Sequence, residues 1–80
     1  MLTDYLALDL ETTGLSPERD RIIEIGAVKY KNGMETERFS RFVKIYQSLP
    51  EKIIELTGIT DKMLSGGDEE KIVLTEFLKF

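Results

Sequence analysis

Residues 7–28, ALDLETTGLSPERDRIIEIGAV, contain the pattern that decides the fold. The chain from residue 5 to residue 10 is apolar apart from Asp9, which is typical of a buried strand. TTGLSPERD follows, and its glycine, serine, proline and aspartate favour a turn. Residues 21–31 are rich in β-branched side chains and predict a second strand. Asn32-Gly33 then predicts a tight hairpin turn, because both residues tolerate positive φ.

Beyond the hairpin the pattern changes from strand to helix. Residues 34–45 predict a third strand, antiparallel to the second. A short helix is expected near Pro50 and should end at Gly58, and Thr60 is expected to cap a second short helix. Asp68 is expected to cap a last helix from residue 69 onward, with apolar residues at spacings of three and four. The order predicts an α/β fold in which three antiparallel strands are followed by helices.

The composition restricts the chemistry available to this chain. It has 80 residues, enough for one small domain, and it contains neither cysteine nor histidine. Disulfides, thiolate metal sites, a cysteine nucleophile and a histidine base are therefore excluded. Any bound metal must be held by oxygen, which favours Mg²⁺, Mn²⁺ or Ca²⁺. The net charge of −4 argues against a broad basic surface for nucleic acid.

No apolar run approaches the roughly 20 residues of a membrane span, and the start of the chain has no basic region followed by an apolar core. We therefore expect a cytoplasmic location and no membrane partner.

Two acids lie one residue apart at the end of the first predicted strand. Asp9 and Glu11 should point to the same face, about 6.6 Å apart along the chain, because side chains on a strand alternate. Such a pair is either solvated beyond the sheet or neutralised by a divalent cation. The segments around the pair favour the cation.

Three segments carry a resemblance to a known family. DLETTGL followed by IIEIGAVKY, and later LTGITDKML, resemble the DnaQ-like (DEDD) 3′–5′ exonucleases, a group that includes the proofreading subunits and domains of bacterial replicative DNA polymerases. The resemblance covers nearly the whole chain, and the three segments occur in the right order. It implies the ribonuclease H-like fold and metal-dependent removal of 3′-terminal nucleotides.

The resemblance also implies a role for individual residues. Asp9 and Glu11 match the first two acids of the family's four-carboxylate site, which holds two Mg²⁺ or Mn²⁺ ions and is the catalytic centre. Thr12, Thr13, Gly14 and Leu15 match the turn around the terminal nucleotide, where Gly14 lets the backbone approach and Leu15 wedges against the bases. Thr57 falls where relatives place a residue that touches the substrate. From the residues alone, a capped turn with an anchoring leucine and a helix-ending Thr-Gly remain open alternatives.

Glu24 is interpreted as structural, paired with Arg21 or with a residue of a neighbouring strand. The acids of residues 68–70 are interpreted as charges at a helix N-terminus, where they are favourable.

The chain lacks the motifs that the family carries downstream of the matched segments. The family needs two further aspartates and a histidine base, and this chain has no histidine. We therefore interpret residues 1–80 as the N-terminal part of a single 3′–5′ exonuclease domain, inactive in isolation. The alternative is a non-catalytic binding module that docks on a polymerase or another chain. A small Ca²⁺-binding protein is a weaker alternative, because the alternating oxygen ligands of a calcium loop are missing.

The expected partners are the 3′ end of single-stranded DNA, with RNA as the other candidate, and a DNA polymerase. Self-association through the open edge of the first strand or through the last helix is also expected. The sequence does not distinguish DNA from RNA, nor a proofreading domain from a free-standing nuclease.

Overall fold

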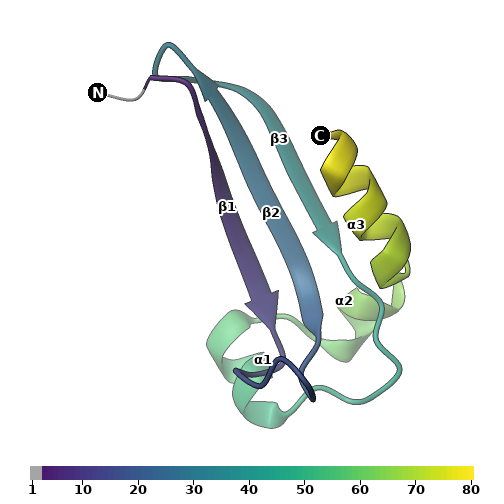
Figure 1. The fold of residues 1–80 in the computed structure, drawn as a ribbon. Helices are drawn as coiled ribbons and strands as arrows, with labels where there is room; N and C mark the ends of the chain where they lie inside the picture. Colours follow the sequence, from purple (N-terminus) through teal and green to yellow (C-terminus); the bar gives the residue numbers. More distant parts are fainter. Residues whose placement is uncertain (1–2) are drawn as a thin grey trace.

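The structure, a computed structural model, describes residues 3–80 and contains three strands followed by three helices (Figure 1). The elements are β1 (Tyr5–Thr12), β2 (Ile22–Lys31), β3 (Met34–Phe42), α1 (Glu51–Thr57), α2 (Asp61–Ser65) and α3 (Glu70–Lys79). The three predicted strands and the helices after them are confirmed. Within residues 3–80, every helix is too short or too polar to cross a membrane.

The strands form one antiparallel sheet in the order β1-β2-β3. The hairpin between β2 and β3 turns at Asn32 and Gly33, whose φ angles are 54° and 75°. This is the positive-φ turn that the Asn-Gly pair predicts. The third strand ends at Phe42, earlier than the predicted residue 45, and Val43 forms only an isolated bridge with Asp68.

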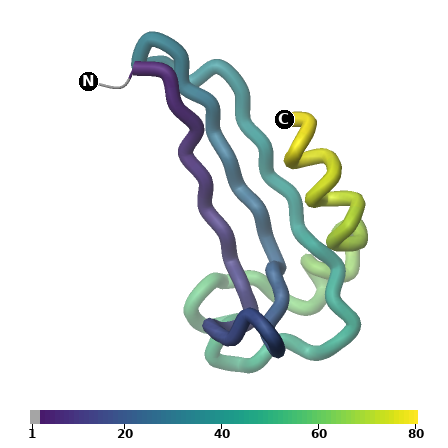
Figure 2. Tube along the Cα trace, viewed as in Figure 1, coloured from purple at the N-terminus to yellow at the C-terminus, as the bar shows by residue number. Residues whose placement is uncertain are grey.

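One side of the sheet is covered unevenly. Figures 1 and 2 show α3 running beside β3, away from β1. Val73 of α3, with Phe77 and the terminal Phe80, packs against the side chains of β2 and β3. The buried members of this cluster are Ile25, Ala27, Phe39, Val43 and Val73.

A second apolar cluster lies where β2 begins. Ile23, fully buried, packs there with Leu49, Ile59 and Leu64 from the helical segment. This cluster fixes α1 and α2 below the sheet, beside the turn that follows β1 (Figure 1). It therefore positions α1 next to the segment that carries the predicted site.

The predicted helix ends of the middle segment are confirmed. Gly58 is left-handed at φ 75° and donates its N–H to the Ile54 carbonyl, as expected for a helix-ending glycine. The Thr60 hydroxyl accepts the Met63 N–H at 3.2 Å and caps α2.

The prediction for Asp68 is wrong. Glu69 occupies the N-cap position of α3, without a side-chain capping bond. The Asp68 carbonyl instead accepts the Lys44 N–H at 2.8 Å, where Asp68 forms a parallel bridge with Val43. This isolated bridge engages the backbone of Asp68, and α3 begins at Glu70, one residue after the predicted start.

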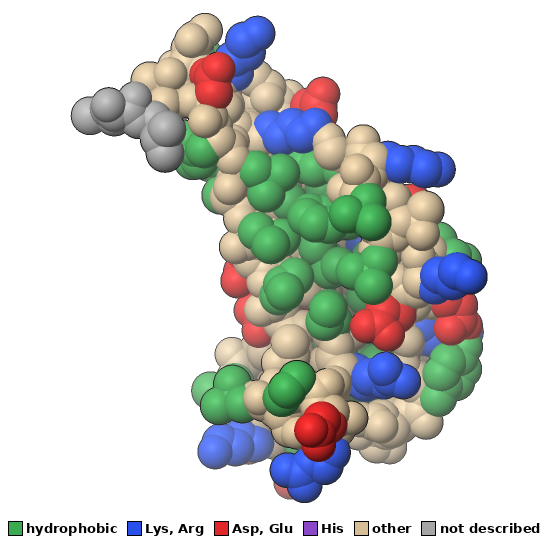
Figure 3. Space-filling view, viewed as in Figure 1, with side chains coloured by type: hydrophobic (Ala, Val, Ile, Leu, Met, Phe, Trp, Pro, Cys, Tyr) green, Lys and Arg blue, Asp and Glu red, His purple; other side chains and the backbone are tan. Residues whose placement is uncertain are grey.

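The side of β1 that α3 leaves free is apolar. Leu6, Leu8 and Leu10 are 44%, 50% and 43% exposed. Figure 3 shows a continuous apolar area over this part of the sheet and the neighbouring flank of α3.

Candidate functional site

The two predicted metal ligands lie on one face of β1. Asp9 is opposite Gly26 and Glu11 is opposite Glu24, and these partners are themselves two residues apart on β2. The register shift of this strand pair comes only after Glu11, so both acids keep the same orientation. Gly26 has no side chain, which leaves open space beside Asp9 on that face.

Glu24 brings a third carboxylate to this face, because it lies directly opposite Glu11. Partial burial, then the charge of Glu11 and then that of Asp9 raise the pKa of Glu24 above its usual value. The predicted pairing of Glu24 with Arg21 is wrong. Arg21 instead forms an ion pair with Glu70 at 3.6 Å. The strand register places Glu24 opposite Glu11.

Among residues 3–80, no cation pairs with Asp9 or Glu11. No group of three or more acids, histidines or cysteines in that range has the arrangement of a complete metal site. The oxygens of Asp9 and Glu11 nevertheless fit a hard divalent cation, which removes the repulsion between them.

The turn after the acids is held together by Asp20. Its carboxylate accepts hydrogen bonds from the Thr13 hydroxyl at 3.0 Å and from the Ser16 N–H at 2.8 Å. Thr13 is buried, and its hydroxyl also accepts the Arg21 N–H at 2.8 Å. The Thr13 hydroxyl therefore both donates and accepts a hydrogen bond inside the protein, and this side chain positions the turn.

Gly14 is required by close packing in this turn. A Cβ atom at position 14 would lie 2.5 Å from the Asp20 carboxylate, so any other residue would displace Asp20. The Thr12 hydroxyl donates to the Gly14 carbonyl at 2.7 Å and fixes the start of the turn. Leu15 follows and is 100% exposed, so the turn presents an apolar side chain to solvent.

A groove of about 530 Å³ separates this turn from α1. It is lined by Leu10, Glu11, Thr12, Thr13, Gly14, Leu15, Pro50, Lys52, Ile53, Leu56 and Thr57. All five predicted substrate-binding residues line it together with Glu11. Asp9 lies outside the lining, two positions further back on β1.

Thr57 stabilises the end of α1 as well as lining the groove. Its hydroxyl donates to the Ile53 carbonyl at 2.7 Å and accepts the Ile59 N–H at 3.0 Å. These bonds agree with the alternative of a helix-ending Thr-Gly.

Several residues of this region were missed by sequence reasoning. Asp20 was noticed only as a turn residue, although its spacing from Thr13 and Ser16 suits a side chain that closes a loop. Lys52 and Leu56 form the far wall of the groove, and Leu56 is largely exposed. Leu56 could have been predicted to line a binding surface, because it is an apolar residue on the outer face of a short helix.

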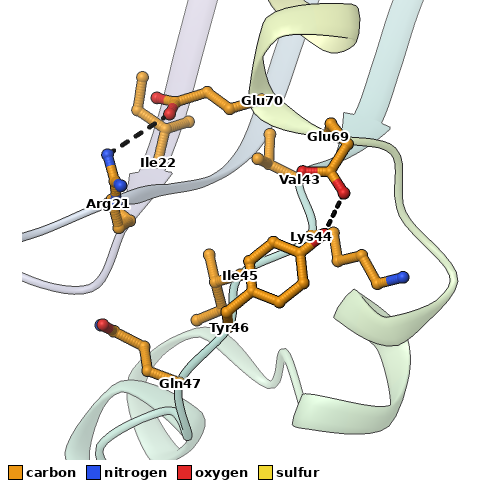
Figure 4. Close-up of a pocket in the computed structure, with 9 residues that line it drawn as sticks. All are labelled: Arg21, Ile22, Val43, Lys44, Ile45, Tyr46, Gln47, Glu69 and Glu70. Carbon is orange, nitrogen blue, oxygen red and sulfur yellow. Dashed lines mark hydrogen bonds and ion pairs between the residues drawn. The ribbon is translucent and has the colours of Figure 1, made fainter.

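A second, smaller cavity of about 160 Å³ lies between the start of β2 and the start of α3 (Figure 4). Arg21 pairs there with Glu70, and the Tyr46 hydroxyl donates to Glu69, which raises the pKa of Tyr46. Three of the four charged side chains that line it thus have partners within the cavity. We interpret this cavity as part of the packing interface between α3 and the rest of the fold.

Residues 6–80 match the family described as "Exonuclease". The chain belongs to the exonuclease family. It is 50% identical over 78 residues to the "DNA polymerase III PolC-type" of Halalkalibacterium halodurans, a match that covers 98% of this chain and 5% of that protein. The corresponding protein of Clostridium perfringens is 47% identical over 77 residues, covering 96% and 5%. The exonuclease chain therefore spans about one-twentieth of the length of these relatives.

Two solved structures share the fold of this exonuclease chain. One, described as "crystal structure of full-length 3′-exonuclease", has a TM-score of 0.84 at 25% identity and covers 96% of this chain and 28% of its own. The other, "3′-end specific recognition of histone mRNA stem-loop by 3′-exonuclease", has a TM-score of 0.82 at 26% identity, covering 96% and 38%. These similarities confirm the DnaQ-like resemblance and the ribonuclease H-like fold.

Proposed function

We propose that this chain carries the first half of the metal site of a 3′–5′ exonuclease that acts on DNA. One observation carries the proposal: Asp9 and Glu11 share a face, no cation within residues 3–80 pairs with them, and Glu11 lines the same groove as Leu15. The membership in the exonuclease family supports a nuclease function. This arrangement suits a metal site made of carboxylates, next to a groove for a nucleotide.

In this proposal Asp9 and Glu11 hold Mg²⁺ or Mn²⁺. A bound divalent ion would supply Lewis-acid activation of the phosphodiester and of the attacking water. Leu15 and Leu56 offer apolar walls on the two sides of the groove, suited to a nucleobase. Gly14 keeps the backbone of the turn accessible, and Lys52 is a cation within reach of the groove. The roles of Thr12, Thr13 and Thr57 are mainly to fix this geometry.

DNA is the proposed substrate because the relatives at about 50% identity are DNA polymerases. The fold neighbour described with a histone mRNA stem-loop makes RNA the second class to test. A cytoplasmic location beside a DNA polymerase follows from the same proposal.

The isolated 80 residues are proposed to be part of one exonuclease domain and to hydrolyse DNA negligibly. The chain has no histidine to act as a base, and the described residues do not form a complete metal site. The second candidate is a non-catalytic binding module. The open outer edge of β1 favours it, because such an edge accepts another polypeptide.

The test is binding of a fluorescent single-stranded DNA with a free 3′ end, followed by anisotropy with and without Mn²⁺. The variants are Asp9→Asn and, as a matched control on another strand, Glu37→Gln. We expect Mn²⁺-dependent binding that is lost in Asp9→Asn and kept in Glu37→Gln. Equal binding by the native chain and Asp9→Asn would contradict the proposed site.

The same samples on a sequencing gel test the proposed incompleteness. We expect no shortening of the DNA from its 3′ end. Shortening by the native chain that disappears in Asp9→Asn would support the site, and would show that the isolated chain is active.

A further inference from the structure

Leu15 lines the groove beside Glu11, but its own side chain has nothing to hold it. Within the described residues Leu15 is 100% exposed, so no packing among them fixes its direction. The direction of this side chain must therefore come from its backbone, that is, from the peptide groups before and after it.

Both of these peptide groups are held by hydrogen bonds. The Gly14 carbonyl, before Leu15, accepts the Thr12 hydroxyl at 2.7 Å. The Ser16 N–H, after Leu15, donates to the Asp20 carboxylate at 2.8 Å. The Asp20 N–H in turn donates to the Ser16 carbonyl at 2.8 Å. The backbone on both sides of Leu15 is thus fixed inside the turn.

The second oxygen of the Asp20 carboxylate ties the turn to the sheet. It accepts the Thr13 hydroxyl at 3.0 Å, and this hydroxyl accepts the Arg21 N–H at 2.8 Å. The Thr13 N–H also donates to the Arg21 carbonyl at 2.9 Å. Thr13 is 5% exposed, so these bonds join the turn to the residue before β2 at a buried point.

Gly14 makes room for this carboxylate. A Cβ atom at position 14 would lie 2.5 Å from the Asp20 oxygen that accepts the Ser16 N–H. One side chain therefore contacts three positions of the turn. All of these contacts lie within residues 12–21, so they do not depend on any other part of the chain.

We propose that Asp20 is a positioning residue for the nucleotide groove and that it acts through Leu15. This role rests on the proposed function of the groove. Asp20 holds the turn in the conformation that presents Leu15 to a nucleobase, and does not itself contact the DNA. A wall that is already ordered raises affinity, because binding does not have to order it. Without the carboxylate, the Ser16 N–H and the Thr13 hydroxyl lose their acceptor and the turn is released.

The proposed metal ligands do not depend on this turn. Asp9 and Glu11 lie in regular pairing between β1 and β2, and the register shifts only after Glu11. A substitution of Asp20 should therefore weaken DNA binding and leave Mn²⁺ binding unchanged. A role in general stability would instead weaken both.

A double-mutant cycle tests the proposal, with fluorescent single-stranded DNA followed by anisotropy in Mn²⁺. We expect Asp20→Ala and Leu15→Ala each to weaken DNA binding by about tenfold. The double variant should be no more than about threefold weaker than either single variant, because Asp20 acts through the side chain that Leu15→Ala removes. Independent roles would multiply to a loss of about a hundredfold. Mn²⁺ affinity should stay within about twofold of the native value in all three variants.

Two further variants separate positioning from stability. Val73→Ala removes buried methyl groups beneath α3, outside the groove lining, and should bind DNA as the native chain does in spite of lower stability. Asp20→Asn has the same shape and keeps one acceptor oxygen, so it should recover part of the affinity that Asp20→Ala loses. Circular dichroism checks the fold of each variant. If Asp20→Ala does not fold, the same cycle with Asp20→Asn should show a smaller loss that is again not additive with Leu15→Ala.

The outcomes distinguish this role from the proposed function. Native affinity in Asp20→Ala would overturn the positioning role and leave the proposed function standing. Additive losses, or a parallel loss of Mn²⁺ affinity, would overturn it as well, because Asp20 would then only stabilise the fold. No DNA binding by the native chain would overturn the proposed function, and the positioning role with it.

Discussion

The two outer strands of the sheet carry the same short pattern with different outcomes. Glu35 and Glu37 of β3, like Asp9 and Glu11 of β1, are acids one residue apart. The strand irregularity in β3 places Glu35 and Glu37 opposite consecutive residues of β2, and therefore on opposite faces. Each then meets a cation, Arg38 at 2.7 Å and Lys29 at 3.2 Å. Asp9 and Glu11 keep one face and meet another acid, Glu24.

The apolar side chains of the two strands also differ, in how far each is buried. Leu8 and Phe39 both lie beside Ala27, in one row across the sheet. Phe39 is 5% exposed and packs against Phe77 and Phe80, whereas Leu8 is half exposed. The β3 side thus satisfies its charges and buries its apolar groups within the chain. On the β1 side, within residues 3–80, the acids form no ion pair and the leucines stay about half exposed.

The largest expected effect comes from truncating the covered member of that row. Phe39→Ala should lower the free energy of unfolding by about 3–5 kcal/mol, because it opens a cavity beneath α3. Leu8→Ala should cost less than about 1 kcal/mol, because Leu8 is 50% exposed. Urea titration followed by circular dichroism measures both. Similar losses for the two variants would show that β1 is buried in the native state.

The next comparison concerns the two aspartates beside the ends of these strands. Asp20→Ala should cost about 1–3 kcal/mol, because the buried Thr13 hydroxyl and the Ser16 N–H lose their acceptor. Asp68→Ala should stay within about 0.5 kcal/mol, because Asp68 holds β3 through its backbone carbonyl. The same urea titration measures the difference. A larger loss for Asp68→Ala would mean that its side chain has a role in α3 after all.

The smallest effects are expected from two glutamates whose pKa values shift in opposite directions. The pKa of Glu24 is raised above 4.5, so its charge destabilises the fold as the pH rises from about 4.5 through the raised value. Glu24→Gln should therefore be slightly more stable than the native chain at pH 7. The two should be equal below about pH 4.5.

The pKa of Glu35 is lowered, first by the hydrogen bond from Arg38, so its contribution has the opposite sign. That contribution is present above pH 4.5 and is lost as the pH falls through the lowered value. Glu35→Gln should be slightly less stable at neutral pH and equal to the native chain in acid. Urea midpoints at pH 7 and pH 3 measure both variants, and a loss of stability in Glu24→Gln at pH 7 would contradict the unfavourable setting of Glu24.

Local sequence signals predicted much of this fold. Asn32-Gly33 predicted the hairpin, Gly58 the end of α1 and Thr60 the cap of α2, because each acts through its own backbone or its nearest neighbours. The face shared by Asp9 and Glu11 follows from the alternation of a strand, which also needs no distant information.

The errors lie where distant segments compete for a residue. Asp68 has the composition of a helix cap, but the backbone of the segment after β3 pairs with it. Glu24 faces Glu11 because of the β1–β2 register, and Arg21 finds Glu70 from another part of the chain. The wall that Lys52 and Leu56 form depends on the packing of α1 against the end of the sheet. No local pattern contains these three relations.

Mn²⁺ binding, followed by the loss of the free-ion signal in electron paramagnetic resonance, tests most directly whether the uncompensated acids form a metal site. We expect saturable binding by the native chain that weakens by about tenfold or more in Asp9→Asn and in Glu11→Gln, since ligand charge sets affinity for hard cations. Glu35→Gln and Glu37→Gln should bind as the native chain does, because these acids already have cations of their own. Equal binding by all five proteins would contradict the account.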